Sequence, residues 1–580
     1  MKQLASILLF LILNFIANAQ FYVKGIVTDK TGAPLYNIKL QLTSKMPAVF
    51  FSGSTGEFGI PCTVPEDTIF IEADGYENYK KLVNTNIYQV ISLKSLPGNR
   101  SVVKNKLASF VINNSGNNSL LQNNTGESYS KLVENYFVKT SEYPESGFTL
   151  NIDRASYSNI RRFLNMGMIV PPDAVRIDEI LNYFNFANDT ASTNIFSLNY
   201  VQSKFPWDKN AQLLFLLLQA PKINVADLPP ANLVFLIDVS GSMDQPNRLP
   251  LLQQSFKLLV ANLRNTDSVS IVVYGGNVGI KLPATSGAEK GKINDAIDKL
   301  SAGGDTPGEY AIKTAYELAE KSFIPGGNNR IILATDGDFN VGQNTDKELE
   351  TLILKYRQTG IYLTCLGVGM GNYKDSKLET LSKNGNGNFA YIDNLDEGEK
   401  ILVTEFSKTL YAVADDASAS VKFDSSDVEE YKLVGYDNLK QNLYNGVGEL
   451  EGGTIGSAHS TLIVFVLHKK NNKVDSILGK FTLKYKLPGT KNEIFFKKQL
   501  SDQSTDFKNL NKQYQFATAV ILFSGLLKQT DYWSHYSWDD VISLTKKSIN
   551  KNDFLQAEFL KLAQKAKKIY EVSKKKRSDK

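Results

Sequence analysis

The chain contains 580 residues, and at about 100–200 residues per domain this length predicts roughly three to five domains. Its hydrophobic content of 42% and charged content of 22% are those of a globular protein, which excludes a wholly disordered, collagen-like or polytopic membrane chain. A net charge of +5 over this length does not indicate a nucleic-acid-binding protein. Two cysteines exclude a disulfide framework, and three histidines leave few candidates for histidine-based catalysis or zinc binding.

The first residues have the pattern of a secretory signal peptide, which we place at 1–19. Lys2 precedes an apolar stretch at 4–16, and the Ala-Asn-Ala sequence that follows predicts cleavage before Gln20. The stretch is short for a membrane-spanning helix of about 20 residues, so we favour cleavage over anchoring. No cysteine follows it, which excludes a lipoprotein anchor. We therefore expect export to the periplasm or cell surface of a Gram-negative bacterium, without a transmembrane span after cleavage.

Residues 20–96 alternate apolar and polar positions in short runs separated by turn residues, which predicts a small β-sandwich. The runs GIVTDKTGAPLYNIKLQL, STGEFGI and EADGYENY resemble the carboxypeptidase-regulatory-like, transthyretin-like module. The resemblance implies a non-catalytic accessory domain outside the cytoplasm. Residues 97–133 are rich in Asn, Ser and Gly, and we interpret them as a flexible linker.

The rest of the chain divides by its hydrophobic patterns. A segment at 134–229 contains helices and then strands, and strands alternate with helices over 230–412. Residues 413–505 are rich in strands, and 506–580 are helical with a basic tail. The apolar run at 516–527 is too short to span a membrane and predicts a buried helix. The strands on either side of 230–412 suggest one β-sandwich into which that domain is inserted.

The strands of 230–412 are apolar throughout, which is typical of a parallel sheet covered by helices on both faces. Cys365 lies in one of these runs, so we interpret it as a buried free thiol. One strand ends in Asp238-Val-Ser240-Gly-Ser242, and a later one ends in Asp336. The loop GGDTPG, which contains Thr306, lies between them. In an open sheet of this type ligands bind at the carboxyl ends of the strands.

Together these segments offer carboxylates and hydroxyls but no imidazole or thiolate. Hard oxygen ligands favour Mg²⁺, Mn²⁺ or Ca²⁺ over zinc. The combination of the Asp-x-Ser-x-Ser motif with the threonine loop and the second aspartate resembles the metal-ion-dependent adhesion site of a von Willebrand factor A (VWA) domain. The fold class that this resemblance implies is a multidomain chain with an α/β doubly wound, Rossmann-like VWA domain. β-Sandwich regions would flank it, and a helical segment would end the chain.

The resemblance also implies a role for each residue of the site. Ser240 and Ser242 would coordinate the ion directly, Thr306 directly or through water, and Asp238 and Asp336 directly or through waters. An Asp or Glu of a partner protein would complete the shell. The sequence departs from the family pattern at Asp305, where a neutral residue is usual, and this carboxylate could sharpen cation preference or simply cap a turn. We regard Asp244, Asp305 and Asp338 as modulators of the ion.

Residues 134–580 resemble the YfbK-like group of bacterial VWA proteins. Matching stretches include FTLNIDRASYSNIRRFLN, LPPANLVFLIDVSGSM and NRIILATDGDFNVG. The group implies a domain architecture but no established enzymatic activity. We therefore expect an exported, metal-dependent protein-binding protein that serves adhesion or scaffolding, rather than an enzyme.

Several alternatives stay open. The chain could be a VWA subunit of a larger envelope or ATPase-linked assembly machine, although an exported protein fits that role less well. A metal-assisted hydrolase lacks an evident general base. Two further alternatives are carbohydrate binding by the first β-sandwich and a weak contact of the basic tail at 574–577 with an anionic surface.

Overall fold

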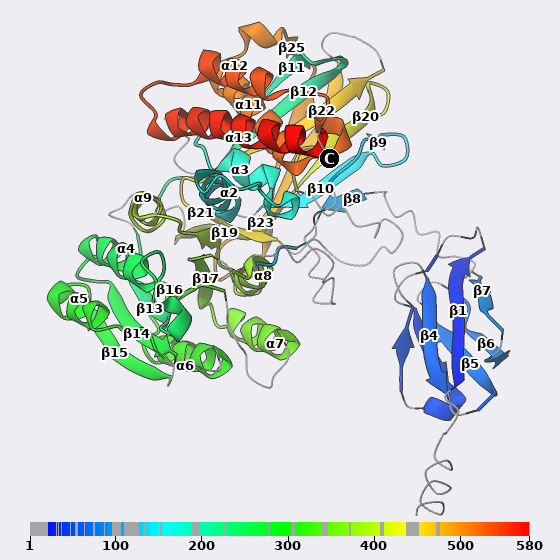
Figure 1. Cartoon of the computed structure of the whole chain (residues 1–580), viewed down its shortest axis with the longest axis horizontal. Coiled ribbons are helices and arrows are strands. Elements are labelled where there is room, and N and C mark those ends of the chain that lie inside the picture. Colours follow the sequence, from blue (N-terminus) through cyan, green and yellow to red (C-terminus); the bar gives the residue numbers. More distant parts are fainter. Residues whose placement is uncertain are drawn as a thin grey trace, which may run out of the picture. The chain divides into compact units, whose positions relative to one another are not determined.

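The computed structural model describes residues 21–94, 106–109 and 127–578, apart from 187–195, 224–227, 304–307, 338–345, 406–410, 437–451, 471–475 and gaps of up to three residues. The expected signal peptide lies outside the described residues. The chain divides into two compact units, Met1–Lys104 and Asn105–Lys580 (Figure 1). Within the described ranges, none of the helices is both long enough and apolar enough to cross a bilayer.

The first unit is a small sandwich of two β-sheets. Apolar side chains alternate with exposed ones along its strands, so Ile60, Ile69 and Ile71 face a common core between the sheets. This confirms the predicted β-sandwich fold of this region. One sheet has the order β4 (Glu57–Cys62), β1 (Phe21–Asp29), β7 (Gln89–Leu93), and the other β3 (Phe50–Phe51), β2 (Lys39–Leu42), β5 (Glu66–Glu72), β6 (Tyr79–Asn84).

The second unit contains the predicted doubly wound α/β domain. All residues of its two central strands are buried, because helices cover both faces of the sheet (Figure 1). The sheet is parallel except at β15, and its strand order is β15 (Gly279–Ser286), β14 (Ser268–Tyr274), β13 (Ala231–Asp238), β16 (Asn328–Thr335), β17 (Tyr362–Gly367), β18 (Phe389–Tyr391). The helices on one face are α4 (Leu249–Ala261), α5 (Lys290–Asp298) and α9 (Leu395–Glu399), which continues as the π-turn Lys400–Thr404. Those on the other face are α6 (Gly308–Lys321), α7 (Asp346–Arg357) and α8 (Asp375–Asn384).

The strands on either side of this domain belong to one β-sandwich. β12 pairs antiparallel with β22, so that Leu214 lies opposite Phe465, and the two sheets share a core. The α/β domain is therefore inserted into the sandwich, as the sequence suggested. One sheet has the order β25 (Ser504–Thr505), β11 (Ser197–Phe205), β12 (Asp208–Gln219), β22 (Ser460–Lys469), β20 (Val428–Leu433), β9 (Val138–Lys139). The other has β24 (Glu493–Ser501), β23 (Ile477–Lys486), β19 (Ala412–Phe423), β10 (Glu145–Thr149), β8 (Lys106–Ser109), with β21 (Gly453–Gly456) also on β19.

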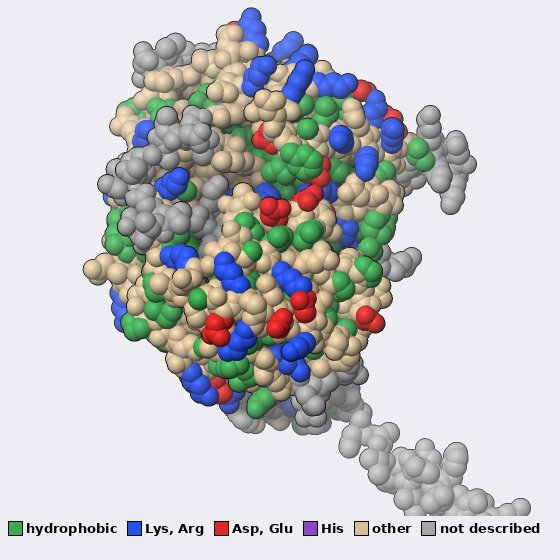
Figure 2. All heavy atoms as spheres, turned by 90° about the vertical axis from the view of Figure 1, so that its left-hand side faces the viewer, with side chains coloured by type: hydrophobic (Ala, Val, Ile, Leu, Met, Phe, Trp, Pro, Cys, Tyr) green, Lys and Arg blue, Asp and Glu red, His purple; other side chains and the backbone are tan. Residues whose placement is uncertain are grey.

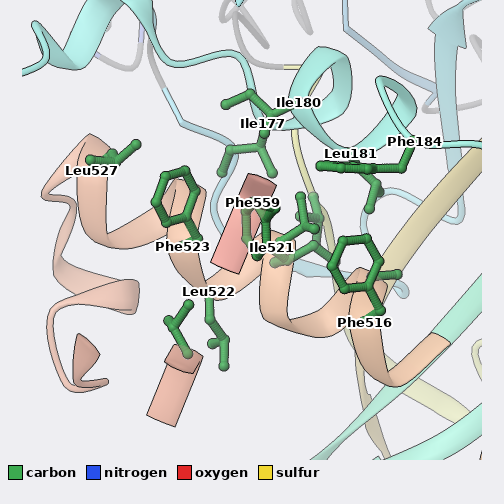
Figure 3. Packing of buried hydrophobic residues seen from close by; sticks show 14 of the residues in the cluster. Ile177, Ile180, Leu181, Phe184, Phe516, Ile521, Leu522, Phe523, Leu527 and Phe559 are labelled. Carbon is green, nitrogen blue, oxygen red and sulfur yellow. The ribbon is translucent and has the colours of Figure 1, made fainter. Parts of the chain in front are cut away.

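A layer of helices covers the outer face of the first of these sheets. Phe184, Phe516 and Phe559 meet edge to face, with ring centroids 5.0–5.6 Å apart (Figure 3). The run at 516–527 lies in one of these helices and is almost entirely buried, which confirms it as a buried helix. The helices are α2 (Ala155–Asn165), α3 (Ile177–Asn182), α11 (Lys512–Lys528), α12 (Trp538–Ser548) and α13 (Phe554–Ser578).

Parts of the predicted linker at 97–133 are ordered, so the interpretation of the whole stretch as flexible is wrong. β8 adds to the sandwich beside β10. Glu127 is buried, and both of its carboxylate oxygens accept hydrogen bonds from Arg162, at 2.7 and 2.8 Å. The composition of the stretch indicated a linker because it is rich in Asn, Ser and Gly, and the contact of Glu127 with Arg162, 35 positions later, leaves no periodic pattern in the sequence.

Candidate metal centre

Asp238, the last residue of β13, is fully buried and fixed by neighbours on both sides. Its Oδ1 accepts a hydrogen bond from the backbone N–H of Ser240 at 2.9 Å. Its Oδ2 accepts from Thr335 Oγ1 at 2.7 Å and from the Tyr274 hydroxyl at 3.2 Å. Burial raises the pKa of this carboxyl above its ordinary value, and the hydrogen bonds from Ser240 and Thr335 oppose the shift. The carboxylate therefore shapes the loop that follows β13.

The two serine hydroxyls of that loop lie side by side. Ser240 Oγ is 3.1 Å from Ser242 Oγ, where the chain leaves β13 and enters the short 3₁₀ turn Gly241–Met243. Ser242 is exposed and Ser240 is half-buried. The loop is attached to the end of the neighbouring strand β14, because Val239 N–H donates a hydrogen bond to the Tyr274 carbonyl at 2.7 Å.

Gly275, directly after β14, allows the loop to sit this close to the sheet. It has a φ of +131°, and a Cβ atom there would lie 2.4 Å from the backbone nitrogen of Ser240. A side chain at this position would therefore displace the serine loop.

Asp336 follows β16, the strand next to β13, and it is buried. Its Oδ2 accepts a hydrogen bond from Arg248 Nη1 at 2.7 Å. The same nitrogen donates to the Ser242 carbonyl at 2.5 Å, and Nη2 donates to the Met370 carbonyl at 2.6 Å. Arg248 thus joins the loops after β13, β16 and β17. The sequence did not single it out, although a basic residue at the start of the largely apolar helix α4 is a weak signal.

The structure brings together four of the predicted site residues, Asp238, Ser240, Ser242 and Asp336, at the carboxyl ends of two adjacent strands. Asp244 is exposed in the turn after Met243. Thr306, Asp305 and Asp338 lie outside the described residues. Their positions in the site therefore stay predictions.

The four described residues fit a small, hard divalent cation. All of their side-chain donors are oxygen atoms, which suits Mg²⁺. Neighbouring ligands of octahedral Mg²⁺, at about 2.0–2.1 Å from the ion, are about 2.9 Å apart, whereas those of Ca²⁺ are about 3.3 Å apart or more. The 3.1 Å between the two serine hydroxyls lies between these values and is compatible with either ion. Within the described part of the chain no cluster of three or more His, Cys, Asp or Glu suits a metal.

Three family models match consecutive parts of the chain. They are von Willebrand factor at 123–215, von Willebrand factor type A domain at 232–409, and uncharacterized protein YfbK, C-terminal, at 408–569. The second match covers the inserted α/β domain with its centre. The third covers later sandwich strands and the C-terminal helices.

Among solved structures, a von Willebrand factor type A protein from Catenulispora acidiphila is 15% identical. It aligns over 63% of this chain and 89% of its own, with a TM-score of 0.39. Among curated proteins, inter-alpha-trypsin inhibitor heavy chain H2 of Mesocricetus auratus is 30% identical over 148 residues, which cover 24% of this chain and 16% of that protein. The uncharacterized protein YfbK of Escherichia coli (strain K12) is 36% identical over 471 residues, which cover 77% of this chain and 82% of the relative. Identity at this level over most of both proteins, together with the inserted α/β domain, shows that the chain belongs to the YfbK family of von Willebrand factor type A domain proteins.

Proposed function

We propose that the protein is an exported, metal-dependent binding protein that captures an acidic side chain of a partner protein, in adhesion or scaffolding. The single observation that carries this proposal is the pair of serine hydroxyls, 3.1 Å apart, between two buried carboxylates at neighbouring strand ends. VWA domains generally serve protein interaction, and the described site has the donor chemistry for a divalent ion.

In this proposal Ser240 and Ser242 hold the ion at the exposed surface. Asp238 orients the serine loop through the Ser240 N–H, and Asp336 supplies negative charge from the next strand. Thr306 contributes a third hydroxyl, as the motif predicts. When bound, the ion supplies positive charge that attracts a carboxylate of the partner.

A binding role suits these residues better than a catalytic one. Both oxygens of Asp238 accept hydrogen bonds, and Asp336 is paired with Arg248. Neither carboxylate is therefore placed as a general base for hydrolysis.

Other parts of the chain would support attachment at the cell envelope. We propose that the first β-sandwich is the carboxypeptidase-regulatory-like accessory domain that its sequence resembles, acting as a spacer or a second binding module. We also propose a weak contact of the basic C-terminal helix with an anionic surface. Lys561, Lys565 and Lys568 are exposed at helical spacing on α13. Figure 2 shows basic side chains gathered towards the top of one face, the level at which α12 and α13 lie in Figure 1. High salt should release this contact.

A pull-down from a Gram-negative envelope extract tests the main proposal. The full chain should retain proteins in Mg²⁺ that EDTA releases. Ser242→Ala, which removes one exposed hydroxyl, should retain none of them. Ser268→Ala is the matched control, because Ser268 lies at the opposite end of the same sheet, and it should behave as the wild type. An identical set of bound proteins under all conditions would refute metal-dependent capture.

A further inference from the structure

The Arg248 guanidinium lies among the candidate metal-binding residues. It donates to Asp336 and to the carbonyl of Ser242, and its side chain is only 12% exposed. We propose that Arg248 sets the charge of the metal-loaded centre. Its positive charge lowers the affinity of the site for the metal and raises the affinity of the loaded site for a carboxylate. This inference rests on the proposed metal-dependent function.

The position of Arg248 is fixed by the fold. Three acceptors from three loops engage its two terminal nitrogens. Gly369 leaves space for the side chain, because a Cβ atom there would lie 2.5 Å from Nε and 2.9 Å from Cγ of Arg248. Since Gly369 also has a φ of +77°, the backbone after β17 is shaped to accept the arginine. The positive charge is thus a built-in part of this edge of the sheet.

The charge of Arg248 has opposite effects on the two ligands. Asp238 and Asp336 together would cancel the charge of a divalent ion, and an incoming carboxylate would then meet a neutral centre. Among these described groups, Arg248 beside Asp336 makes the loaded centre one charge more positive. Coulomb interactions between groups a few ångströms apart at a partly buried site change binding constants by about tenfold or more. Arg248 should therefore repel the metal and attract the carboxylate.

A purely structural role for Arg248 makes a different prediction. If the arginine only holds the three loops together, its removal should disorder the serine loop and lower the affinities for the metal and for the carboxylate together. If its charge matters, removal should move the two affinities in opposite directions. Arg248→Lys separates the two roles as well, because lysine keeps the charge but cannot reproduce the planar, two-nitrogen contact.

The experiment measures both affinities on the full chain. Mn²⁺ binding is followed by electron paramagnetic resonance, and acetate, the simplest carboxylate probe, by its proton relaxation at the Mn²⁺-loaded protein. Arg248→Gln should bind Mn²⁺ about tenfold more tightly and acetate about tenfold more weakly than the wild type. Arg248→Lys should resemble the wild type in both affinities.

The matched control is Arg264→Gln. Arg264 also pairs with an aspartate of this domain, Asp267 at 2.7 Å, but at the other end of the sheet. It should change neither affinity. Loss of both affinities in Arg248→Gln, or in Arg248→Lys if the glutamine variant does not fold, would overturn the inference while leaving metal binding by the wild type intact. A wild type that binds no Mn²⁺ would instead overturn the proposed function, and the inference with it.

Discussion

Arg161 of α2 and Glu397 of α9 form a buried ion pair, with Nη2 2.7 Å from Oε2. The same guanidinium donates to Asp393, after β18, and to Glu558 of α13. Tyr183 also donates to Glu397, at 2.5 Å. The last helix of the VWA domain is therefore fastened to the helical layer by charged and polar groups from three distant parts of the chain.

Removal of this arginine should destabilise the second unit strongly. Arg161→Ala would leave Asp393 and Glu397 buried without their common partner, and a broken buried ion pair costs about 3–5 kcal/mol. Urea denaturation followed by tryptophan fluorescence measures the effect, because all three tryptophans, Trp207, Trp533 and Trp538, lie in this unit.

The exposed pair of Lys313 and Glu317 on α6 provides the control. Lys313→Ala should change the free energy of unfolding by less than about 1 kcal/mol. Equal effects of the two substitutions would show that the Arg161 cluster does not fasten the domain.

Asp153 should make the stability fall as the pH rises. Burial raises its pKa to about 6, an effect that the Glu379 carboxylate reinforces and Lys383 opposes. The unfolded chain has a value of about 4 for this group. Because the folded value is the higher one, the contribution of Asp153 to stability is complete below about pH 4 and is lost as the pH rises through about 6.

Asp153→Asn should remove the free-energy cost of burying an ionised carboxylate at high pH. The amide oxygen of the new side chain can still accept the hydrogen bond from Phe389 N–H. The variant should gain about 3 kcal/mol over the wild type at pH 8, and the gain should shrink towards pH 4. Urea denaturation at both pH values checks the difference. A gain that is independent of pH would contradict the assignment.

Gly275→Ala should impair the centre without removing any of its ligands. The new Cβ atom would collide with the Ser240 backbone, and φ of +131° is strained for alanine. We expect a loss of about 2 kcal/mol in stability and more than tenfold in Mg²⁺ affinity, measured by thermal unfolding and calorimetry. Gly279→Ala in β15 is the control, because nothing lies within 4 Å of its Cβ position. Intact Mg²⁺ binding in Gly275→Ala would count against the described geometry.

The two thiols should be unreactive in the folded protein. Cys62 and Cys365 are both free and buried, which confirms the prediction for Cys365. Burial raises the pKa of the Cys365 thiol well above its usual range, so little thiolate forms. A thiol-specific reagent should label neither cysteine in the native protein and both in urea. Rapid labelling of one native thiol per chain would show that one of the cores is open.

The sequence was sufficient to predict the fold of the VWA domain and part of its centre. β13 contains the apolar run LVFLI and β16 the apolar run IILA, which indicated buried strands. A candidate ligand residue stands at the carboxyl end of each strand, so the strand ends were also visible in the sequence. The insertion into one sandwich followed from strands on both sides of the domain, and β12 and β22 indeed pair.

Contacts between distant polar residues could not be predicted in the same way. Arg248 reaches Asp336 across 88 positions, and Arg162 fixes Glu127 within a stretch that has a linker composition. Such pairs leave no periodicity in the sequence, because each partner alone is also typical of a solvated surface. The support of Asp238 by Tyr274 and Thr335 was missed for the same reason.

Titration of the metal-free full chain with Mg²⁺ by calorimetry tests the central claim most directly. The comparison is between the wild type, Ser268→Ala and the double variant Ser240→Ala with Ser242→Ala. We predict one Mg²⁺ per chain for the wild type and for Ser268→Ala, and an affinity at least about tenfold lower for the double variant, which loses two neighbouring oxygen ligands. Equal Mg²⁺ affinity in all three proteins would contradict the assignment of the metal to this edge of the sheet.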